Sequence, residues 1–277
     1  VAAVSETTTV TVNPTPAGTI SNNGPVCAGG VVELTFTSTM GTGPFDIIVD
    51  GTTYNNVASG TVFATLTEGA DFTGTTNFEL TSITDLGVTP SCVAAVSETT
   101  TVTVNPAPAG TISNNGPVCA GGSVELTFTA TTGTGPYDIV VAGTTYNNVA
   151  SGAVFATLTE GADFTGTTNF ELTSITDLGV TPSCVAAVSE TTTVTVNPAP
   201  AGTISNNGPV CAGGTVELTF TASSGTGPFD IVVAGTTYNN VASGTVFATL
   251  TEGADFTGTT NFELTSITDL GVTPSCV

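Results

Sequence analysis

Apolar and polar residues alternate over several short stretches of the chain. In "VELTFT", the apolar side chains of Val32, Leu34 and Phe36 fall on one face and the polar side chains fall on the other. The same alternation starts at Phe45 in "FDIIV". A period of two residues is the pattern of a β-strand with one buried face. Both stretches are therefore predicted to be half-buried strands.

Further strands are predicted at "TVFATL" from Thr61, at "NFELTSIT" from Asn77 and at "VSETTTVTV" from Val96. Between the strands lie "SNNGP", "AGG", "GTGP", "DGTTYNN" and "TEGAD", whose Gly, Asn, Asp and Pro residues are typical of turns. No window shows the apolar stripe of a helix. About seven short strands in roughly 90 residues predict an all-β fold, the two-sheet immunoglobulin-like sandwich.

The sequence repeats itself with a period of 92 residues. The stretch "CVAAVSETTTVTVNP" occurs at Cys92 and again at Cys184, and the chain opens on the same letters without the cysteine. A repeat of this size is the folding unit. The chain is therefore predicted to be a tandem array of immunoglobulin-like β-sandwich domains.

Proline-rich joins, "NPTPAG" once and "NPAPAG" twice, divide the array. Residues 1–14 are expected to be the last strand of a preceding repeat, residues 15–106 and 107–198 to be complete repeats, and residues 199–277 to be a repeat without its last strand. Two interpretations fit this division. Either the sequence is a window on a longer continuous array, which we favour, or Val1–Pro14 completes the last domain of another chain.

The charge is one-sided, because the chain has no Lys, Arg or His and 22 Asp and Glu, a formal net charge of −22. Such a chain is repelled by nucleic acid and by anionic membrane surfaces, so neither is expected as a partner. No apolar run is long enough to insert in a membrane, and no signal peptide is recognisable. We expect a mature, soluble segment of a longer protein.

All six cysteines fall at two positions of the period: Cys27, Cys119 and Cys211 in "GPVCAGG", and Cys92, Cys184 and Cys276 in "TPSC". The favoured interpretation is one disulfide in each repeat, Cys27 with Cys92, Cys119 with Cys184, and Cys211 with Cys276. The alternative pairs Cys92 with Cys119 across a domain boundary. Connectivity is not readable from sequence alone. Either pairing implies an oxidising, extracellular compartment.

The inventory of side chains argues against an enzyme. Without His or Lys there is no general base for a Ser or Cys nucleophile. Paired carboxylates such as Glu68 and Asp71 could in principle hydrolyse a glycoside, but the chain has no Trp to form a sugar platform. No cofactor is expected.

Calcium is the alternative use for these acids, because it binds carboxylate and carbonyl oxygens in loops. Each period offers three acidic residues in Gly- and Thr-rich surroundings, although solvated loops are the favoured interpretation. The candidate calcium ligands are Glu68, Asp71, Asp85, Glu160, Asp163, Asp177, Glu252, Asp255 and Asp269.

The order "GTIS…PVCAGGxVELTFT", "GTGPFDI", "NFELTSITD…C" and "TVTVNP" resembles the immunoglobulin-like or PKD-like repeats of giant type IX-secreted surface proteins of gliding bacteria. These include gliding adhesins and extracellular filaments of the grappling-hook kind. The resemblance implies a secreted or cell-surface stalk or filament used in attachment, motility or prey capture. If the chain forms such a filament, self-association into a homo-oligomer is expected, because its Thr-, Ser- and Asn-rich surface lacks the lysines that discourage strand edges from pairing. A cell-surface or glycan target is expected to be bound through domains outside this sequence.

A second function is a multivalent, glycan-binding or calcium-dependent adhesin module that would use the variable loop 38–43. The substitutions in that loop, "STM", "ATT" and "ASS", are small and chemically plain. They favour the structural interpretation.

Overall fold

Strand β3 (Val31–Met40) buries the alternate residues that its sequence pattern predicts. In a computed structural model, which describes residues 4–277, Val32, Leu34 and Phe36 are all 0% exposed. The neighbouring residue Glu33 is exposed. One face of the strand therefore lies in the core and the other meets solvent.

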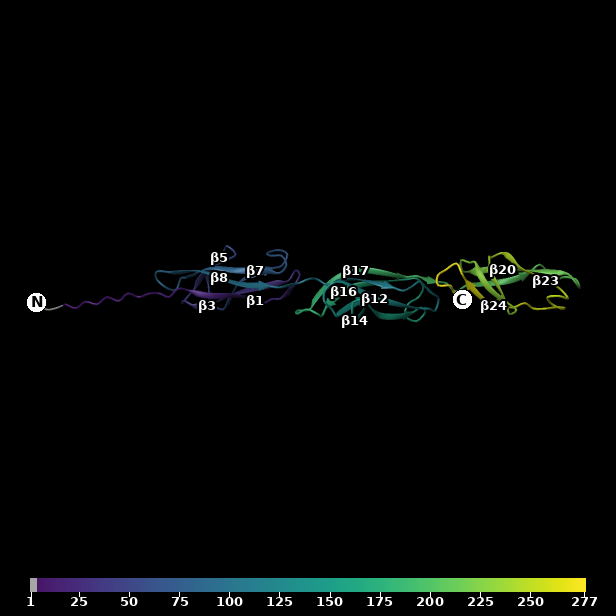
Figure 1. The fold of residues 1–277 in the computed structure, drawn as a ribbon, viewed down its shortest axis with the longest axis horizontal. Coiled ribbons are helices and arrows are strands. Elements are labelled where there is room, and N and C mark those ends of the chain that lie inside the picture. The colour runs from purple at the N-terminus through teal and green to yellow at the C-terminus, as the bar shows by residue number, and fades with distance from the viewer. Residues whose placement is uncertain (1–3) are drawn as a thin grey trace. The chain divides into compact units, whose positions relative to one another are not determined.

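Two sheets make up the first repeat. One has the strand order β1-β3-β6 and the other has the order β5-β4-β7-β8, and several of these strands are labelled in Figure 1. The two-residue strands β2 and β9 pair in parallel. The bounds are β1 (Ala17–Asn22), β2 (Val26–Cys27), β4 (Phe45–Val49), β5 (Thr52–Val57), β6 (Thr61–Thr67), β7 (Thr76–Asp85), β8 (Cys92–Val102) and β9 (Val104–Asn105).

The second repeat has the same arrangement, with sheets β10-β12-β15 and β14-β13-β16-β17 and the parallel pair β11-β18. Its strands are β10 (Ala109–Asn114), β11 (Val118–Cys119), β12 (Ser123–Thr132), β13 (Tyr137–Val141), β14 (Thr144–Val149), β15 (Ala153–Thr159), β16 (Thr168–Asp177), β17 (Cys184–Val194) and β18 (Val196–Asn197).

The third repeat has the sheets β19-β20-β23 and β22-β21-β24. Its strands are β19 (Ala201–Asn206), β20 (Thr215–Ser224), β21 (Phe229–Val233), β22 (Thr236–Val241), β23 (Thr245–Thr251) and β24 (Leu264–Asp269). The described residues 4–14 form no strand. Residues 1–3, which belong to the expected last strand of a preceding repeat, lie outside the described residues.

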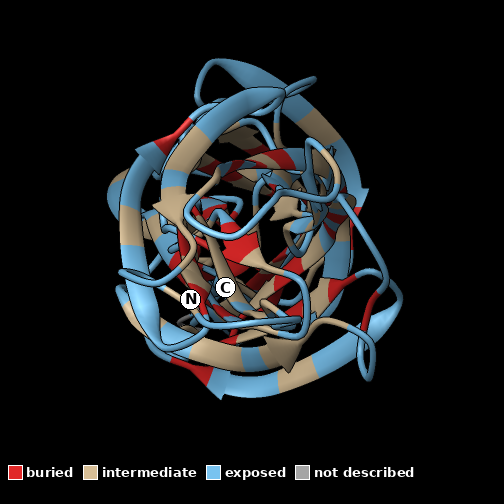
Figure 2. Cartoon of the chain, turned by 90° about the vertical axis from the view of Figure 1, so that its right-hand side faces the viewer, coloured by how far each residue is buried: buried red, intermediate tan, exposed pale blue. Residues whose placement is uncertain are grey.

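The two sheets of a repeat pack face to face around an apolar core. In the first repeat the ring of Phe36 on β3 meets the ring of Phe45 on β4 edge to face, with centroids 5.4 Å apart. Phe128 and Tyr137 repeat this contact in the second repeat at 5.4 Å. Along the strands, buried residues are interleaved with half-buried and exposed ones (Figure 2). The fold is an array of immunoglobulin-like β-sandwiches, which confirms the predicted class.

Two predictions for single segments were wrong or incomplete. The stretch "DGTTYNN" was expected to be a turn, but its residues from Thr52 onward belong to β5, which pairs with β4. Only Asp50 and Gly51, both with positive φ, make the reversal. The last strand was expected from Val96 but begins at Cys92. No helix in residues 4–277 is long and apolar enough to cross a membrane.

Packing divides the chain into two compact units whose border runs through the second repeat. Unit 1 is Val1–Ala109 with Thr132–Pro136 and Thr176–Ala186, and unit 2 is Gly110–Thr131 with Tyr137–Ile175 and Ala187–Val277. Loops of the second repeat are thus grouped with the first repeat. A disulfide bond accompanies this grouping of the loops with the first repeat.

Candidate functional site: the disulfide-linked junctions

Each complete repeat has two distinct ends. We call the end at which β1 and β8 start the head, and the end at which β9 stops the tail. At the head, Cys92 lies opposite Asp85 in the register of β7 and β8. At the tail, Cys27 lies opposite Asn105 in the register of β2 and β9. The two cysteines of one repeat therefore lie at opposite ends of the sandwich.

This separation rules out the expected disulfide within a repeat. Cys92 and Asn105 are 13 residues apart along strands β8 and β9, which at about 3.3 Å per residue amounts to roughly 40 Å. A disulfide needs the two Cα atoms within about 7 Å. The predicted pairing of Cys27 with Cys92, and of its equivalents in the other repeats, is therefore wrong.

The structure instead pairs the tail cysteine of one repeat with the head cysteine of the next. Cys27 is bonded to Cys184, with Cα atoms 5.6 Å apart. Cys119 is bonded to Cys276, with Cα atoms 5.5 Å apart. Both links span 157 residues of sequence. The first lies within unit 1 and the second within unit 2.

Cys92 and Cys211 are free thiols, and Cys211 is exposed. The alternative pairing of Cys92 with Cys119 is also absent from the structure. In the two observed bonds, the tail cysteine of one repeat pairs with the head cysteine of the next. Cys92 is the head cysteine of the first repeat and Cys119 is the tail cysteine of the second, so this pattern does not join them. Cys119 is bonded to the head cysteine of the third repeat instead.

An asparagine supplements each disulfide. The side-chain amide of Asn105, the residue of β9 that lies opposite Cys27, donates to the carbonyl oxygen of Thr181 at 3.3 Å. Asn197 makes the equivalent bond to the carbonyl of Thr273 at 3.5 Å. This role of the Asn in "VNP" was missed from the sequence, where the residue was interpreted only as part of a join. A polar side chain directly before a Pro-rich join is the signal that could have indicated it.

A glutamate holds the loop that carries the tail cysteine. Glu68 accepts hydrogen bonds from the backbone N–H of Gly29 at 2.8 Å and of Gly74 at 3.1 Å. These bonds, first that from Gly29, lower the pKa of the Glu68 carboxyl, since they favour its ionised form. Glu160 does the same with Gly121 and Gly166 in the second repeat. The carboxylate thus fixes the loop directly after the cysteine.

A buried aspartate organises the loops at the head. Asp85 is 0% exposed and accepts bonds from the backbone N–H groups of Thr42, Gly43 and Gly87 at 2.9, 3.0 and 2.9 Å. The bond from Thr42 is the largest cause of its lowered pKa. Asp177 makes the same three bonds in the second repeat. For Asp177, burial raises the pKa, but the bonds from backbone N–H groups outweigh it and the pKa is lowered.

The candidate calcium ligands of one repeat do not lie together. Asp85 lies at the head, while Glu68 bonds the loop at the tail, on the far side of the ten-residue strand β3. Asp71 accepts a bond from the backbone N–H of Thr67 at 2.7 Å. Within residues 4–277 no three acidic or cysteine side chains are placed to hold a metal ion. These carboxylates bind backbone N–H groups, and calcium binding stays a prediction.

The third repeat places its acids in the same way. Asp269 accepts from the backbone N–H of Thr226 at 2.7 Å, and Glu252 accepts from Gly213 at 2.9 Å. Asp163 and Asp255 accept from the backbone N–H groups of Thr159 and Thr251, respectively. All nine acidic candidates therefore serve as local anchors of loops.

No protein-family model matches the chain, and no curated protein matches it. Among solved structures, an I-band fragment of titin is similar at 13% identity and a TM-score of 0.38, over 95% of this chain and 90% of that one. A fragment of mouse cadherin-23 is similar at 11% identity and a TM-score of 0.32, over 94% and 96% of the two chains. A fibronectin-III array of RIM-binding protein has 13% identity and a TM-score of 0.23, over 97% and 96%.

Strand order and junction chemistry together define the class of protein. The chain is a tandem array of immunoglobulin-like β-sandwich repeats in which disulfides connect the tail of one repeat to the head of the next.

Proposed function

We propose that the chain is a repeat region of a long extracellular stalk or filament. The observation that carries the proposal is the pair of junction disulfides, Cys27–Cys184 and Cys119–Cys276. A disulfide confined to one repeat would stabilise that domain alone. A disulfide between repeats restrains the junction, which is where a chain of domains bends and separates.

The composition supports the same use. Disulfides form and persist in oxidising compartments, which supports an extracellular or cell-surface location. A chain with no Lys or Arg offers no cleavage site to trypsin-like proteases. Near-identical repeats supply length, whereas three different binding sites would need different surfaces. The resemblance to repeats of type IX-secreted adhesins and filaments supports roles in attachment, motility or prey capture.

The proposal also fits the inventory and the contacts of the acidic side chains. The carboxylates that could act as a pair, Glu68 and Asp71, both accept hydrogen bonds from backbone N–H groups. The chain has no His, Lys or Arg to act beside them. A structural role needs none of these groups.

The test is electron microscopy of the native material, combined with a bending measurement on the purified chain. Filaments with an axial repeat near one sandwich length, about 40 Å, or a multiple of it, are expected on or outside the cells. The oxidised chain is expected to be a stiff rod, and Cys27→Ala/Cys119→Ala a jointed one. The matched control is Cys92→Ala/Cys211→Ala, which removes the two free thiols and is expected to stay stiff. Equal flexibility of both variants would contradict the proposal.

A further inference from the structure

The two sulfurs of each junction disulfide differ in their access to solvent. The head cysteines Cys184 and Cys276 are both 1% exposed. The tail cysteines Cys27 and Cys119, to which they are bonded, are half-buried. A thiol from solvent therefore reaches the sulfur of the tail cysteine more readily than that of the head cysteine.

Carbonyl oxygens lie against the same sulfurs. The Sγ of Cys27 lies 3.7 Å from the carbonyl oxygen of Ser183 and 3.9 Å from that of Pro182. The Sγ of Cys184 lies 3.6 Å from the carbonyl oxygen of Pro182. The second junction has the same three contacts, at 3.7, 3.9 and 3.6 Å. A bonded sulfur has no hydrogen to donate, so the negative ends of these carbonyl dipoles face it and oppose a thiolate there.

Carboxylates belong to both sides of the junction. On the tail side, Glu68 accepts from the backbone N–H of Gly29, two residues after Cys27. On the head side, the buried Asp177 ends β16, which pairs with β17, the strand that Cys184 begins. In the other two repeats the equivalent Asp and Cys lie opposite each other in the strand register. These negative charges raise the cost of a further negative charge on either sulfur.

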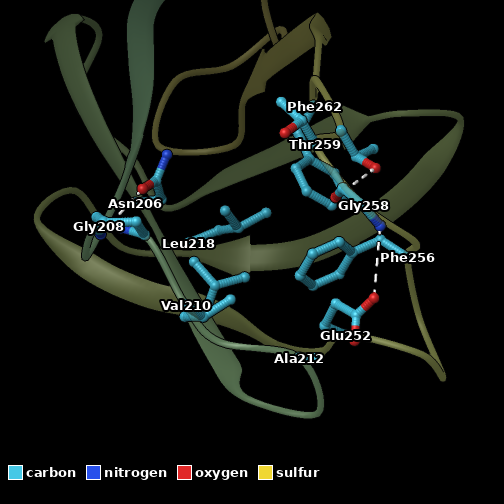
Figure 3. Close-up of a pocket in the computed structure, with 13 residues that line it drawn as sticks. Asn206, Gly208, Val210, Ala212, Leu218, Glu252, Phe256, Gly258, Thr259 and Phe262 are labelled. Atoms are coloured by element: carbon cyan, nitrogen blue, oxygen red, sulfur yellow. Dashed lines mark hydrogen bonds between the residues drawn. The ribbon is translucent and has the colours of Figure 1, made fainter.

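The glutamate at the tail is a feature of all three repeats. In the third repeat Glu252 accepts from the backbone N–H groups of Gly213 and Gly258 at 2.9 and 3.5 Å, and Figure 3 shows its bond to Gly258. Gly213 lies two residues after the tail cysteine, as Gly29 does in the first repeat. Each tail cysteine thus has a carboxylate bonded to its own loop.

No positive side chain offsets these charges. The chain has no Lys, Arg or His, and residues 4–277 form no helix. Cationic neighbours and helix N-termini are the features that stabilise thiolates in proteins. The incoming thiolate and the leaving thiolate are therefore both destabilised, and an incoming thiol with a further negative charge is destabilised most.

We propose that each junction disulfide is a thiol-exchange site with two selectivities. The attacking thiol bonds to the tail sulfur. It is an uncharged or cationic thiol, since the formal charge of −22 on the chain repels anionic ones. The proposal goes beyond the stalk and does not depend on it, because it names the class of reductant that opens a junction.

The exchange proceeds in two displacements. A thiolate attacks the Sγ of Cys27, the bond between Cys27 and Cys184 breaks, and Cys184 leaves as a thiolate that takes a proton from solvent. A second thiolate attacks the sulfur of the bound thiol and releases Cys27, which is protonated in turn. The two small thiols lose two electrons and two protons and become one disulfide, while the protein disulfide gains them and becomes two thiols.

The first test locates the attacked sulfur in the whole chain. The variant Cys92→Ala/Cys211→Ala is used, so that no free thiol of the chain takes part. It is treated briefly with mercaptoethanol and then acidified, which stops the exchange because thiolates become protonated. Pepsin, which cleaves in acid and needs no Lys or Arg, yields the peptides for mass spectrometry. The mercaptoethanol adduct is expected on Cys27 and Cys119, and adducts in equal amounts on their bonded partners would overturn the proposal.

The second test compares three thiols of similar size: the cationic cysteamine, the uncharged mercaptoethanol and the anionic mercaptoethanesulfonate. Each rate constant is expressed per thiolate and divided by that for hydroxyethyl disulfide, an uncharged reference. At about 10 mM salt the ratio is expected to fall at least about tenfold from cysteamine to mercaptoethanesulfonate. At about 1 M salt, where the Debye length is about 3 Å, most of this difference should vanish. Equal ratios at low salt would overturn the charge selectivity.

A substitution at each junction tests the local charge. Ala28 directly follows the tail cysteine and is exposed, and Ala120 is its equivalent at the second junction. Ala28→Lys is expected to speed reduction of the first junction disulfide by mercaptoethanesulfonate at least about threefold, while the second disulfide keeps its rate as the internal control. Ala120→Lys should do the reverse, and the uncharged Ala28→Gln should change neither rate. An A28K chain whose two disulfides respond equally would contradict local control.

The result is independent of the stalk. A stiff rod whose disulfides exchange at both sulfurs would leave the stalk standing and refute the exchange site. A jointed chain that exchanges at the tail sulfur alone would refute the stalk and leave the exchange site standing.

Discussion

Cys27 is bonded to Cys184, 157 residues away, and not to Cys92 of its own repeat. The backbone explains this choice, because β8 carries the chain from Cys92 at the head of the sandwich to the tail, where Cys27 pairs with Asn105. The disulfide that the sequence led us to expect inside a domain thus lies between domains. The junction, and not the sandwich, receives the covalent bond.

Loss of a junction disulfide is expected to destabilise the linked pair of repeats. Closing a 157-residue loop contributes up to about 5 kcal/mol by the chain-entropy estimate. Urea denaturation of Cys27→Ala/Cys184→Ala should therefore show a lower free energy of unfolding than the wild type. Cys92→Ala is the control, because it removes a cysteine that is already free. Equal losses in both variants would mean that the observed pairing does not hold in solution.

The buried aspartate at the head is expected to be sensitive to neutralisation. Asp177 is 1% exposed and accepts three backbone N–H groups. In Asp177→Asn the amide NH₂ would face some of these donors, at a cost of about 1–3 kcal/mol in the free energy of unfolding. Glu190→Gln is the control, since this side chain is exposed on β17. A denaturation curve for D177N that overlays the control would contradict this role.

Acid is expected to weaken the fold below about pH 4. The pKa values of Asp85, Asp177, Asp269, Glu68 and Glu160 are lowered in the folded state. A lowered folded pKa gives stability that is fully present above the unfolded pKa, near 4. That stability is lost as the pH falls through the folded pKa.

The check is a series of thermal melts between pH 2 and pH 7.5. The melting temperature should be flat from about pH 5.5 to 7.5, because the chain has no His to titrate there, and should fall below about pH 4. The fall should be smaller in Asp177→Asn, which has one of these carboxyls fewer. A melting temperature that rises on acidification would contradict the assignment.

A glycine at the head of the second repeat is expected to tolerate no side chain. A Cβ at Gly110 would lie 2.7 Å from the ring of Phe128 and 2.8 Å from the carbonyl oxygen of Thr129. Gly110→Ala must therefore displace a fully buried ring, at a cost of about 1–3 kcal/mol. Thr111→Ala, at the exposed next position of β10, is the control. Differential scanning calorimetry of both variants measures the difference.

The sequence predicted the sandwich well because its strands follow a strict alternation. Val32, Leu34 and Phe36 are buried as their spacing indicates, and turn residues mark most strand ends. The strand β5 was missed, since "TTYNN" is polar and half-exposed at an edge and carries no alternation.

The junctions were less predictable, for a physical reason. Cysteine spacing gives the loop length of a disulfide but not the direction in which strands carry each cysteine. Only the register of β8 against β7 and of β9 against β2 places Cys92 and Cys27 at opposite ends. Asp85 is a similar case, because a "TD" after an apolar strand could equally be a solvated acid or a metal ligand. Its burial depends on the glycine-rich loop that folds over it.

The two disulfides overlap in sequence, since Cys119 lies inside the segment that Cys27 and Cys184 close. A pulling force on the chain is therefore transmitted along a covalent path that is shorter than the full backbone. It crosses from Cys27 to Cys184, returns along the backbone to Cys119, and crosses again to Cys276. This route uses about a third of the backbone. Even with every strand unravelled, the oxidised chain would reach only roughly 300 Å, against roughly 900 Å when reduced. The disulfides therefore limit how far the array can be extended, and the redox state of the cysteines sets that limit.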